Sequence, residues 1–149
     1  MKFPLAVLAA AAALPALAKN PADLAAEVQK GVTAYNAQDL KYYEAMLDTQ
    51  VTYIADDGAI FPGKDRVVGL FKRLFARPTP PRIEVTDVVT SGRGDTAWAT
   101  FKWSLNAGEK SRLGVATTLF HREAGQWKVF LIQTTAAGHA MPAGAPHKQ

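Results

Sequence analysis

The spacing of apolar residues changes once along the chain, from a helical period to an alternating one. In the first half, apolar side chains recur every three or four positions, as in Leu24, Val28, Val32 and Tyr35, which places them on one stripe of a helix. From Arg82 onward the period becomes two, which is typical of strands with one buried face. The pattern therefore predicts helices first and a sheet afterwards.

The first half is expected to hold three helices and a short hairpin. The first helix begins near Pro21, the second follows a cap at Asp39, and the third spans about 64–76 before a proline-rich stretch ends it. Between the second and third helices, two short β-rich segments at 51–55 and 59–61 flank Asp57-Gly58, a dipeptide that favours a hairpin turn.

Four longer strands are expected in the second half, at 82–91, 96–106, 111–122 and 126–135. The turns between them are too short for a crossover, so successive strands must be antiparallel neighbours. The predicted fold class is α+β, with three N-terminal helices packed on a strongly curved antiparallel sheet that forms a cone with an internal pocket.

The N-terminus has the features of a cleavable signal peptide at residues 1–18. Lys2 precedes an apolar run at 5–14, and Ala16-Leu17-Ala18 forms a small-residue cleavage site. The run is shorter than the ~20 residues that cross a bilayer, so we expect no membrane attachment after cleavage. These features predict a periplasmic or secreted protein, and we expect one domain at 19–137 and a disordered tail at 138–149.

The composition excludes several classes of function. The chain has no cysteine, so thiol catalysis and thiolate metal sites are excluded. The net charge of +4 is scattered, which does not suit a nucleic-acid interface. The three histidines are far apart with no carboxylate at ligand spacing, so we expect neither a metal nor another cofactor.

Several short motifs in order resemble the SnoaL-like proteins of the nuclear transport factor 2-like (cystatin-like) superfamily. The segment from Tyr35 to Leu40 resembles the family's N-A-x-D-L sequence between the first two helices. Further matches are Asp57-Gly58, Gly63-Lys64-Asp65, Gly94-Asp95-Thr96-Ala97 and the segment from Gly125 to Val129. The resemblance covers about residues 24–135 and implies a helix-covered, curved sheet with a pocket.

The resemblance implies a divided function, because relatives include isomerases, cyclases, dehydratases and hydrolases as well as binding and assembly modules. In the ketosteroid isomerases of the superfamily, a tyrosine and a protonated aspartate form an oxyanion hole, while a second aspartate moves the proton. The corresponding positions here are Gly31, a site near Ala55 beside Asp56, and Thr117 or Thr118. That catalytic set is therefore not reproduced.

Alternation along the strands predicts which residues face the pocket. If Trp127 points inward, strict alternation carries Gln133 inward with it, and the neighbouring strand would contribute Val115 and Thr117. The predicted lining is Tyr53, Phe61, Phe71, Trp103, Val115, Thr117 and Gln133, with the entrance beside Asp56. For Phe71 we favour plain core packing, whereas for Trp103 and Gln133 a packing role and a ligand role stay equally open.

We expect an exported protein that binds a small apolar molecule, with no clear catalytic set. One alternative is a cofactor-independent lyase, isomerase or hydrolase using Asp56 and Tyr53 as acid–base groups, and another is a dimerisation module with a vestigial pocket. Trp98 and Thr100 lie on the outward parity of their strand, which predicts a homodimer through the outer face of the sheet.

Overall fold

The computed structural model describes residues 22–137, which form three helices and six strands. The elements in chain order are α1 (Ala22–Asn36), α2 (Leu40–Met46), β1 (Leu47–Ile54), β2 (Ile60–Pro62), α3 (Lys64–Phe75), β3 (Arg82–Arg93), β4 (Thr96–Ala107), β5 (Lys110–Glu123) and β6 (Gln126–Ala136). The expected signal peptide at 1–18 and tail at 138–149 lie outside the described residues. Within residues 22–137, no helix is long and apolar enough to cross a membrane.

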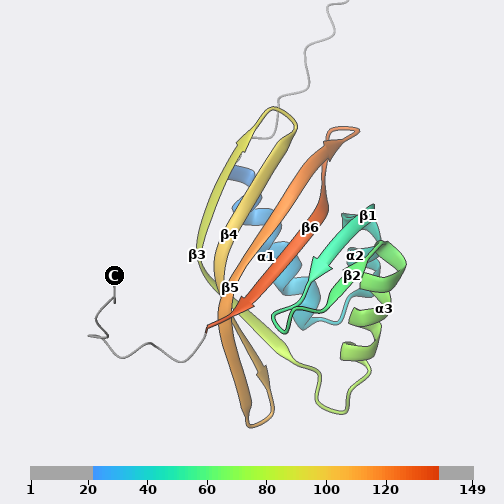
Figure 1. The fold of residues 1–149 in the computed structure, drawn as a ribbon, viewed down its shortest axis with the longest axis vertical. Coiled ribbons are helices and arrows are strands. Elements are labelled where there is room, and N and C mark those ends of the chain that lie inside the picture. Colours follow the sequence, from blue (N-terminus) through green and yellow to red (C-terminus); the bar gives the residue numbers. More distant parts are fainter. Residues whose placement is uncertain (1–21, 138–149) are drawn as a thin grey trace, which may run out of the picture.

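The strands form one curved, open sheet in the order β2-β1-β6-β5-β4-β3. Neighbouring strands from β3 to β6 are antiparallel, as the short turns predict, but β1 pairs with β6 in parallel. The sheet is therefore mixed and not antiparallel throughout. All three helices lie on its concave side, and in Figure 1 the strands β4 and β5 pass in front of α1.

The expected elements are present, with one boundary moved. β1 begins at Leu47, four residues before the expected start at 51, and Leu47 has extended backbone. Its side chain is buried. Asp39 caps α2 as expected, because its carboxylate accepts a hydrogen bond from the Tyr42 amide at 3.1 Å.

Asn36 joins the end of α1 to the start of β3. Its side-chain amide donates to the carbonyl oxygen of Ile83, and its amide oxygen accepts from the Ile83 N–H, each at 2.8 Å. These two bonds satisfy backbone groups of an edge strand that would otherwise be left without partners in a half-buried position. The asparagine of the N-A-x-D-L sequence therefore has a structural role, which fixes α1 across the sheet.

The inner face of β4 matches the alternation expected from the sequence. Ala97, Ala99 and Trp103 are buried, whereas Trp98 and Lys102 are exposed on the outer face. Trp127 is also buried at the start of β6, as its position predicts. The concave face of the sheet and the helices thus enclose one core, and the candidate site lies within it.

Candidate ligand-binding cavity

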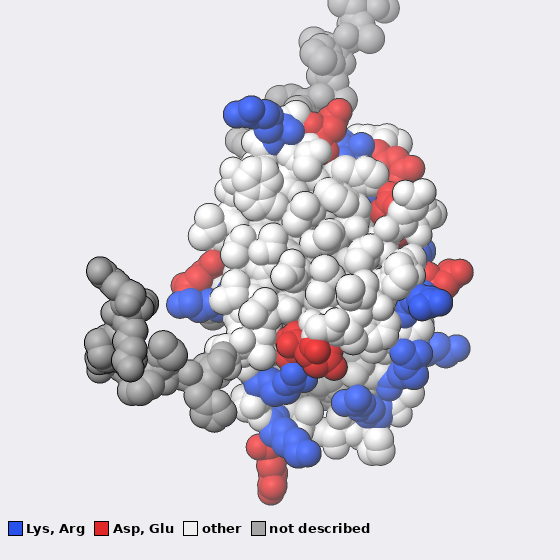
Figure 2. Space-filling view, viewed as in Figure 1, with Lys and Arg blue, Asp and Glu red and all other residues white. Residues whose placement is uncertain are grey.

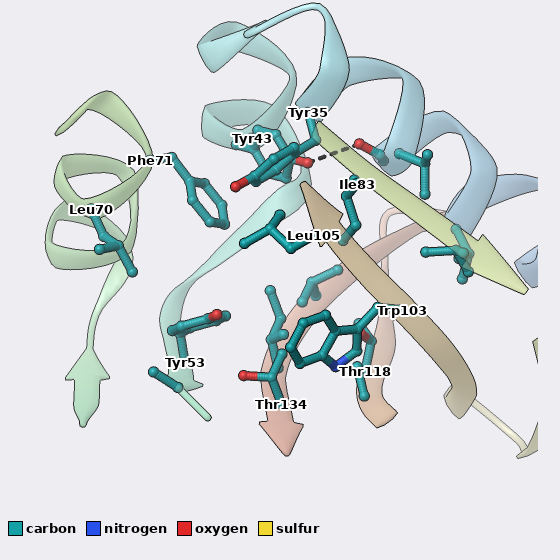
Figure 3. A pocket seen from close by; sticks show the side chains of 18 of the residues that line it. Tyr35, Tyr43, Tyr53, Leu70, Phe71, Ile83, Trp103, Leu105, Thr118 and Thr134 are labelled. Carbon is teal, nitrogen blue, oxygen red and sulfur yellow. Dashed lines mark hydrogen bonds between the residues drawn. The ribbon is translucent and has the colours of Figure 1, made fainter. Parts of the chain in front are cut away.

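A cavity of about 360 Å³ lies between the helices and the concave face of the sheet. Side chains from all three helices and from β1 to β6 surround it, so residues far apart in sequence meet there. Figure 3 shows Tyr35 and Tyr43 at one end of the cavity and Tyr53, Thr118 and Thr134 at the other. The wall between the two ends is mainly aromatic and aliphatic.

The helical wall is a cluster of aromatic rings. The Phe71 ring lies nearly parallel to that of Phe75, with 6.0 Å between ring centroids, and its centroid is 4.5 Å from that of Tyr43. Tyr35 meets both phenylalanines edge-on. Edge-on and offset contacts of this kind are favourable for aromatic pairs, so the rings hold one another in place. The wall is therefore preformed.

The sheet wall is open because the inner face of β5 carries small side chains. Gly114, Ala116 and Thr118 alternate along this face and are all buried. The Trp103 ring packs over Gly114, where an added Cβ would lie 2.7 Å from the ring and 1.9 Å from the Thr135 carbonyl oxygen. The space above Ala116 and Thr118 forms part of the cavity.

Polar groups are concentrated where β1 ends. The Arg112 guanidinium donates a hydrogen bond to the Asp56 carboxylate, and both residues line the cavity. The Arg112 side chain is 54% exposed and that of Asp56 only 12%, so the carboxylate lies on the cavity side of the pair. Next to them, the Thr134 hydroxyl donates to the Ile54 carbonyl oxygen at 3.2 Å.

The four tyrosines of the chain all surround the cavity and all have raised pKa values. Burial raises the pKa of Tyr35 and of Tyr42 to about 12 and raises that of Tyr43 further. Burial also raises the pKa of Tyr53, and the Asp56 charge adds to this while hydrogen bonding with Thr134 opposes it. The phenols are therefore neutral hydrogen-bonding groups at neutral pH.

Two of these hydroxyls are already occupied by backbone groups of α1. Tyr43 donates to the Gly31 carbonyl oxygen at 2.8 Å, and Tyr42 donates to that of Glu27 at 3.4 Å. They attach α2 to α1 and are not available in the same geometry to a ligand. Tyr53, at the other end, is the tyrosine adjacent to the Asp56–Arg112 pair.

The structure brings together part of the lining expected from the sequence. Tyr53, Phe61, Phe71 and Trp103 line the cavity, and Asp56 lies at the same end as Tyr53. Phe71 is also a central member of the packed ring cluster. The other three expected lining residues are not on the cavity wall: Val115, Thr117 and Gln133.

Val115 and Thr117 lie on the outer face because the register of β4 and β5 differs from the one assumed. Trp103 pairs with Gly114, and side chains of directly paired residues point to the same face, so the even-numbered residues of β5 face inward. Val115 is consequently 45% exposed. The turn between Ala107 and Lys110, which pair with each other, sets this register.

Gln133 lies on the outer face because a bulge interrupts β6. Phe120 pairs with Val129 but Leu119 pairs with Leu131, so β6 has one extra residue at this point. A bulge reverses the alternation beyond it, so Ile132 and Thr134 face the cavity and Gln133 is exposed. No turn residue marks this position in the sequence.

Sequence reasoning missed Arg112 and Thr134. Thr134 was missed because the bulge in β6 turns it toward the cavity. Arg112 was missed because its orientation depends on the register of β5. The even-numbered residues of β5 face the cavity, and they include both Ala116 and Arg112. A correct assignment of the turn before β5 would therefore have identified Arg112.

The sequence from residue 25 to residue 134 matches the SnoaL-like domain family. The chain belongs to this family. No curated protein matches this SnoaL-like domain.

Solved structures share the fold of this SnoaL-like domain at low sequence identity. An NTF2-like protein of unknown function from Pseudomonas putida KT2440 is 18% identical, with a TM-score of 0.72, covering 85% of this chain and 92% of that one. A candidate dehydratase of the NTF2-like family from Streptomyces avermitilis is 19% identical, with a TM-score of 0.73 and coverage of 79% and 96%. A protein with a cystatin-like fold from Caulobacter vibrioides is 15% identical, with a TM-score of 0.67 and coverage of 78% and 89%. These likenesses establish the fold alone.

The raised tyrosine pKa values predict a loss of stability in alkali. Above pH 10.0, the ordinary tyrosine pKa, phenols of the unfolded chain release protons while those of the folded chain keep them. The unfolded state then binds fewer protons, so the free energy of unfolding falls as pH rises from about 10 toward the folded values. Tyrosinate absorbance should therefore appear together with loss of the far-ultraviolet circular dichroism. Ionisation centred on pH 10 in protein that stays folded would contradict the burial of these rings.

Proposed function

We propose that this SnoaL-like domain binds a small, mainly apolar molecule in its cavity. The observation that carries the proposal is the lining: a mainly aromatic and aliphatic wall, with the Asp56–Arg112 pair and Tyr53 together at one end. Ligand sites typically combine an apolar wall with a few convergent polar groups. A cavity of about 360 Å³ falls in the range of small-molecule sites, which begins at roughly 300 Å³.

The polar end restricts the chemistry of the ligand. Arg112 supplies hydrogen-bond donors, Asp56 supplies an acceptor oxygen, and the protonated Tyr53 supplies a hydroxyl. A molecule with a rigid apolar body and one or two oxygen or nitrogen atoms at one end would satisfy both parts of the cavity. The body would lie against Phe71 and Trp103.

Acid–base catalysis by Asp56 and Tyr53 is the alternative function. The two residues lie at the same end of the cavity, as such a reaction needs. Binding is favoured because one Asp56 oxygen is engaged by Arg112 and burial keeps the Tyr53 phenol protonated. Conversion of a bound compound that is abolished by Asp56→Asn, with binding retained, would establish catalysis instead.

Filling the cavity should abolish ligand binding. Ala116→Phe places a ring in the open space above β5, so it should weaken binding of the apolar fluorophore N-phenyl-1-naphthylamine by at least about tenfold, equivalent to about 1.4 kcal/mol. Fluorescence titration measures this, and native mass spectrometry of wild-type protein from its own host would identify a retained compound.

Thr117→Phe is the matched control, because it adds the same ring one position along on the outer face. Its affinity for the fluorophore should equal that of the wild type. Equal affinities for wild type and Ala116→Phe would refute the cavity as the binding site and favour an assembly module.

We also propose that the domain forms a homodimer through the outer face of its sheet. Figure 2 shows an uncharged area across the upper middle of this face, with charged side chains above it, beside it and in the lower middle. Apolar side chains exposed on it are Val89, Trp98, Leu113 and Val115. Exposed apolar patches of this kind mark protein interfaces, which supports a second copy as the partner.

Trp98→Glu should convert the dimer to a monomer, because it places a charge within the apolar face, where Trp98 is 41% exposed. Sedimentation velocity at micromolar concentration measures the change. Ile60→Glu is the control, since Ile60 is equally apolar and more exposed but lies on the edge strand β2. A wild-type protein that sediments as a monomer would refute the interface.

The proposed site of action is outside the cytoplasm, in the periplasm or the medium, and it rests on the signal-peptide features of residues 1–18. N-terminal sequencing of the exported protein should begin at Lys19. Retention of Met1 in protein recovered from the periplasm or the medium would refute cleavage.

A further inference from the structure

A second group of polar side chains lies away from the cavity, where β5 ends and β1 begins. It consists of Asp48 on β1 with His121 and Glu123 on β5, and one potential ligand atom of each lies within 4.8 Å of the others. The two β5 residues are two positions apart, so they share the outer face of the strand. The expectation of no metal rested on the absence of carboxylates at ligand spacing, and the His121–Glu123 pair was not counted among them.

The sheet topology brings Asp48 to the pair. Strand β6 lies between β1 and β5, so Asp48 reaches His121 across β6, and its Oδ2 atom lies 2.9 Å from the His121 Nε2 atom. The other carboxylate oxygen accepts a hydrogen bond from the Gln50 amide at 2.6 Å, which orients the group. The Phe130 ring meets the imidazole nearly edge-on, with 5.6 Å between centroids, and this contact fixes the ring plane.

The His121 Nε2 atom is buried, although the side chain as a whole is 38% exposed, and its contact with Asp48 does not have hydrogen-bond geometry. The His121 Nε2 and Asp48 Oδ2 atoms are therefore close without forming a well-aligned N–H···O hydrogen bond. An imidazole nitrogen and carboxylate oxygens are common metal-ion ligands, and here one ring nitrogen lies beside the oxygens of two carboxylates.

The charge at the cluster also suits a cation. Asp48 and Glu123 bring two negative charges to one imidazole. Lys128, the cross-strand partner of His121, directs its ammonium group to the Ala45 carbonyl oxygen instead. The Lys128 ammonium group is thus engaged away from the two carboxylates.

We propose that Asp48, His121 and Glu123 bind one divalent transition-metal ion, with Zn²⁺ as the reference ion and solvent completing the coordination. One imidazole nitrogen and two carboxylate oxygens are ordinary Zn²⁺ ligands, and Zn²⁺ binds them at about 2.0–2.2 Å. The exposed Glu123 side chain is free to move inward to reach that distance. Bound metal would join β1 to β5 across β6 and would leave the cavity unchanged.

The test is titration of the full chain with Zn²⁺ by calorimetry and with Co²⁺ by visible absorption, in a buffer without chelators. One equivalent should bind, Co²⁺ should give ligand-field bands, and saturating Zn²⁺ should raise the melting temperature, because a ligand that binds only the folded state stabilises it. His121→Asn should weaken binding by more than about 100-fold, since even a lost second-shell partner costs about 10- to 100-fold. Asp48→Asn should also weaken binding.

His139 and His147 supply the matched control, because they could bind metal independently of the fold. The double variant His139→Asn, His147→Asn should bind Zn²⁺ as the wild type does. Metal-free melting curves of His121→Asn and wild type show whether the variant is folded. If the variant is unfolded, Co²⁺ bands in the wild type still decide the question. Undiminished binding by folded His121→Asn, loss of binding in the double variant, or no ligand-field bands in the wild type would overturn the proposal.

Discussion

The close contact between Trp103 and Gly114 is the constraint on which the interior of this domain depends. Only a glycine allows the indole to lie against β5, because a Cβ at that position would overlap both the ring and the Thr135 carbonyl oxygen. With the indole held there, the small residues further along β5 face the helices without filling the space between. The domain therefore encloses a cavity where a uniformly bulky strand would have produced a solid core.

The two ends of the cavity differ in what they can offer a ligand. At the helical end, the hydroxyls of Tyr42 and Tyr43 are used to attach one helix to another. At the other end, Tyr53 and the Asp56–Arg112 pair face the same space. The Asp56–Arg112 ion pair thus lies at the end with the exposed guanidinium, whereas the helical end combines aromatic surface with tyrosine hydroxyls, two of which are bonded to α1.

The sequence predicted the fold well because the signals that define it are local. Helical spacing, the Asp39 cap and the prolines after α3 each act over a few residues, and the matches with the observed elements are close. The cavity lining was predicted less well because it depends on pairing between strands. A two-residue turn set the register of β5 and one bulge set that of β6, and each moved a row of side chains to the other face.

The parallel pairing of β1 with β6 has a consequence for the order in which the molecule can be assembled. The last strand in chain order occupies a central place in the sheet, and the Thr134 hydroxyl contacts Ile54, 80 positions earlier. Until β6 is present, β1 and β2 have no hydrogen-bonded connection to β3, β4 and β5. Contacts between such distant segments slow folding, because a long loop must close first. Truncation before β6 would thus leave two separate sheet fragments and four exposed strand edges, a form prone to aggregation.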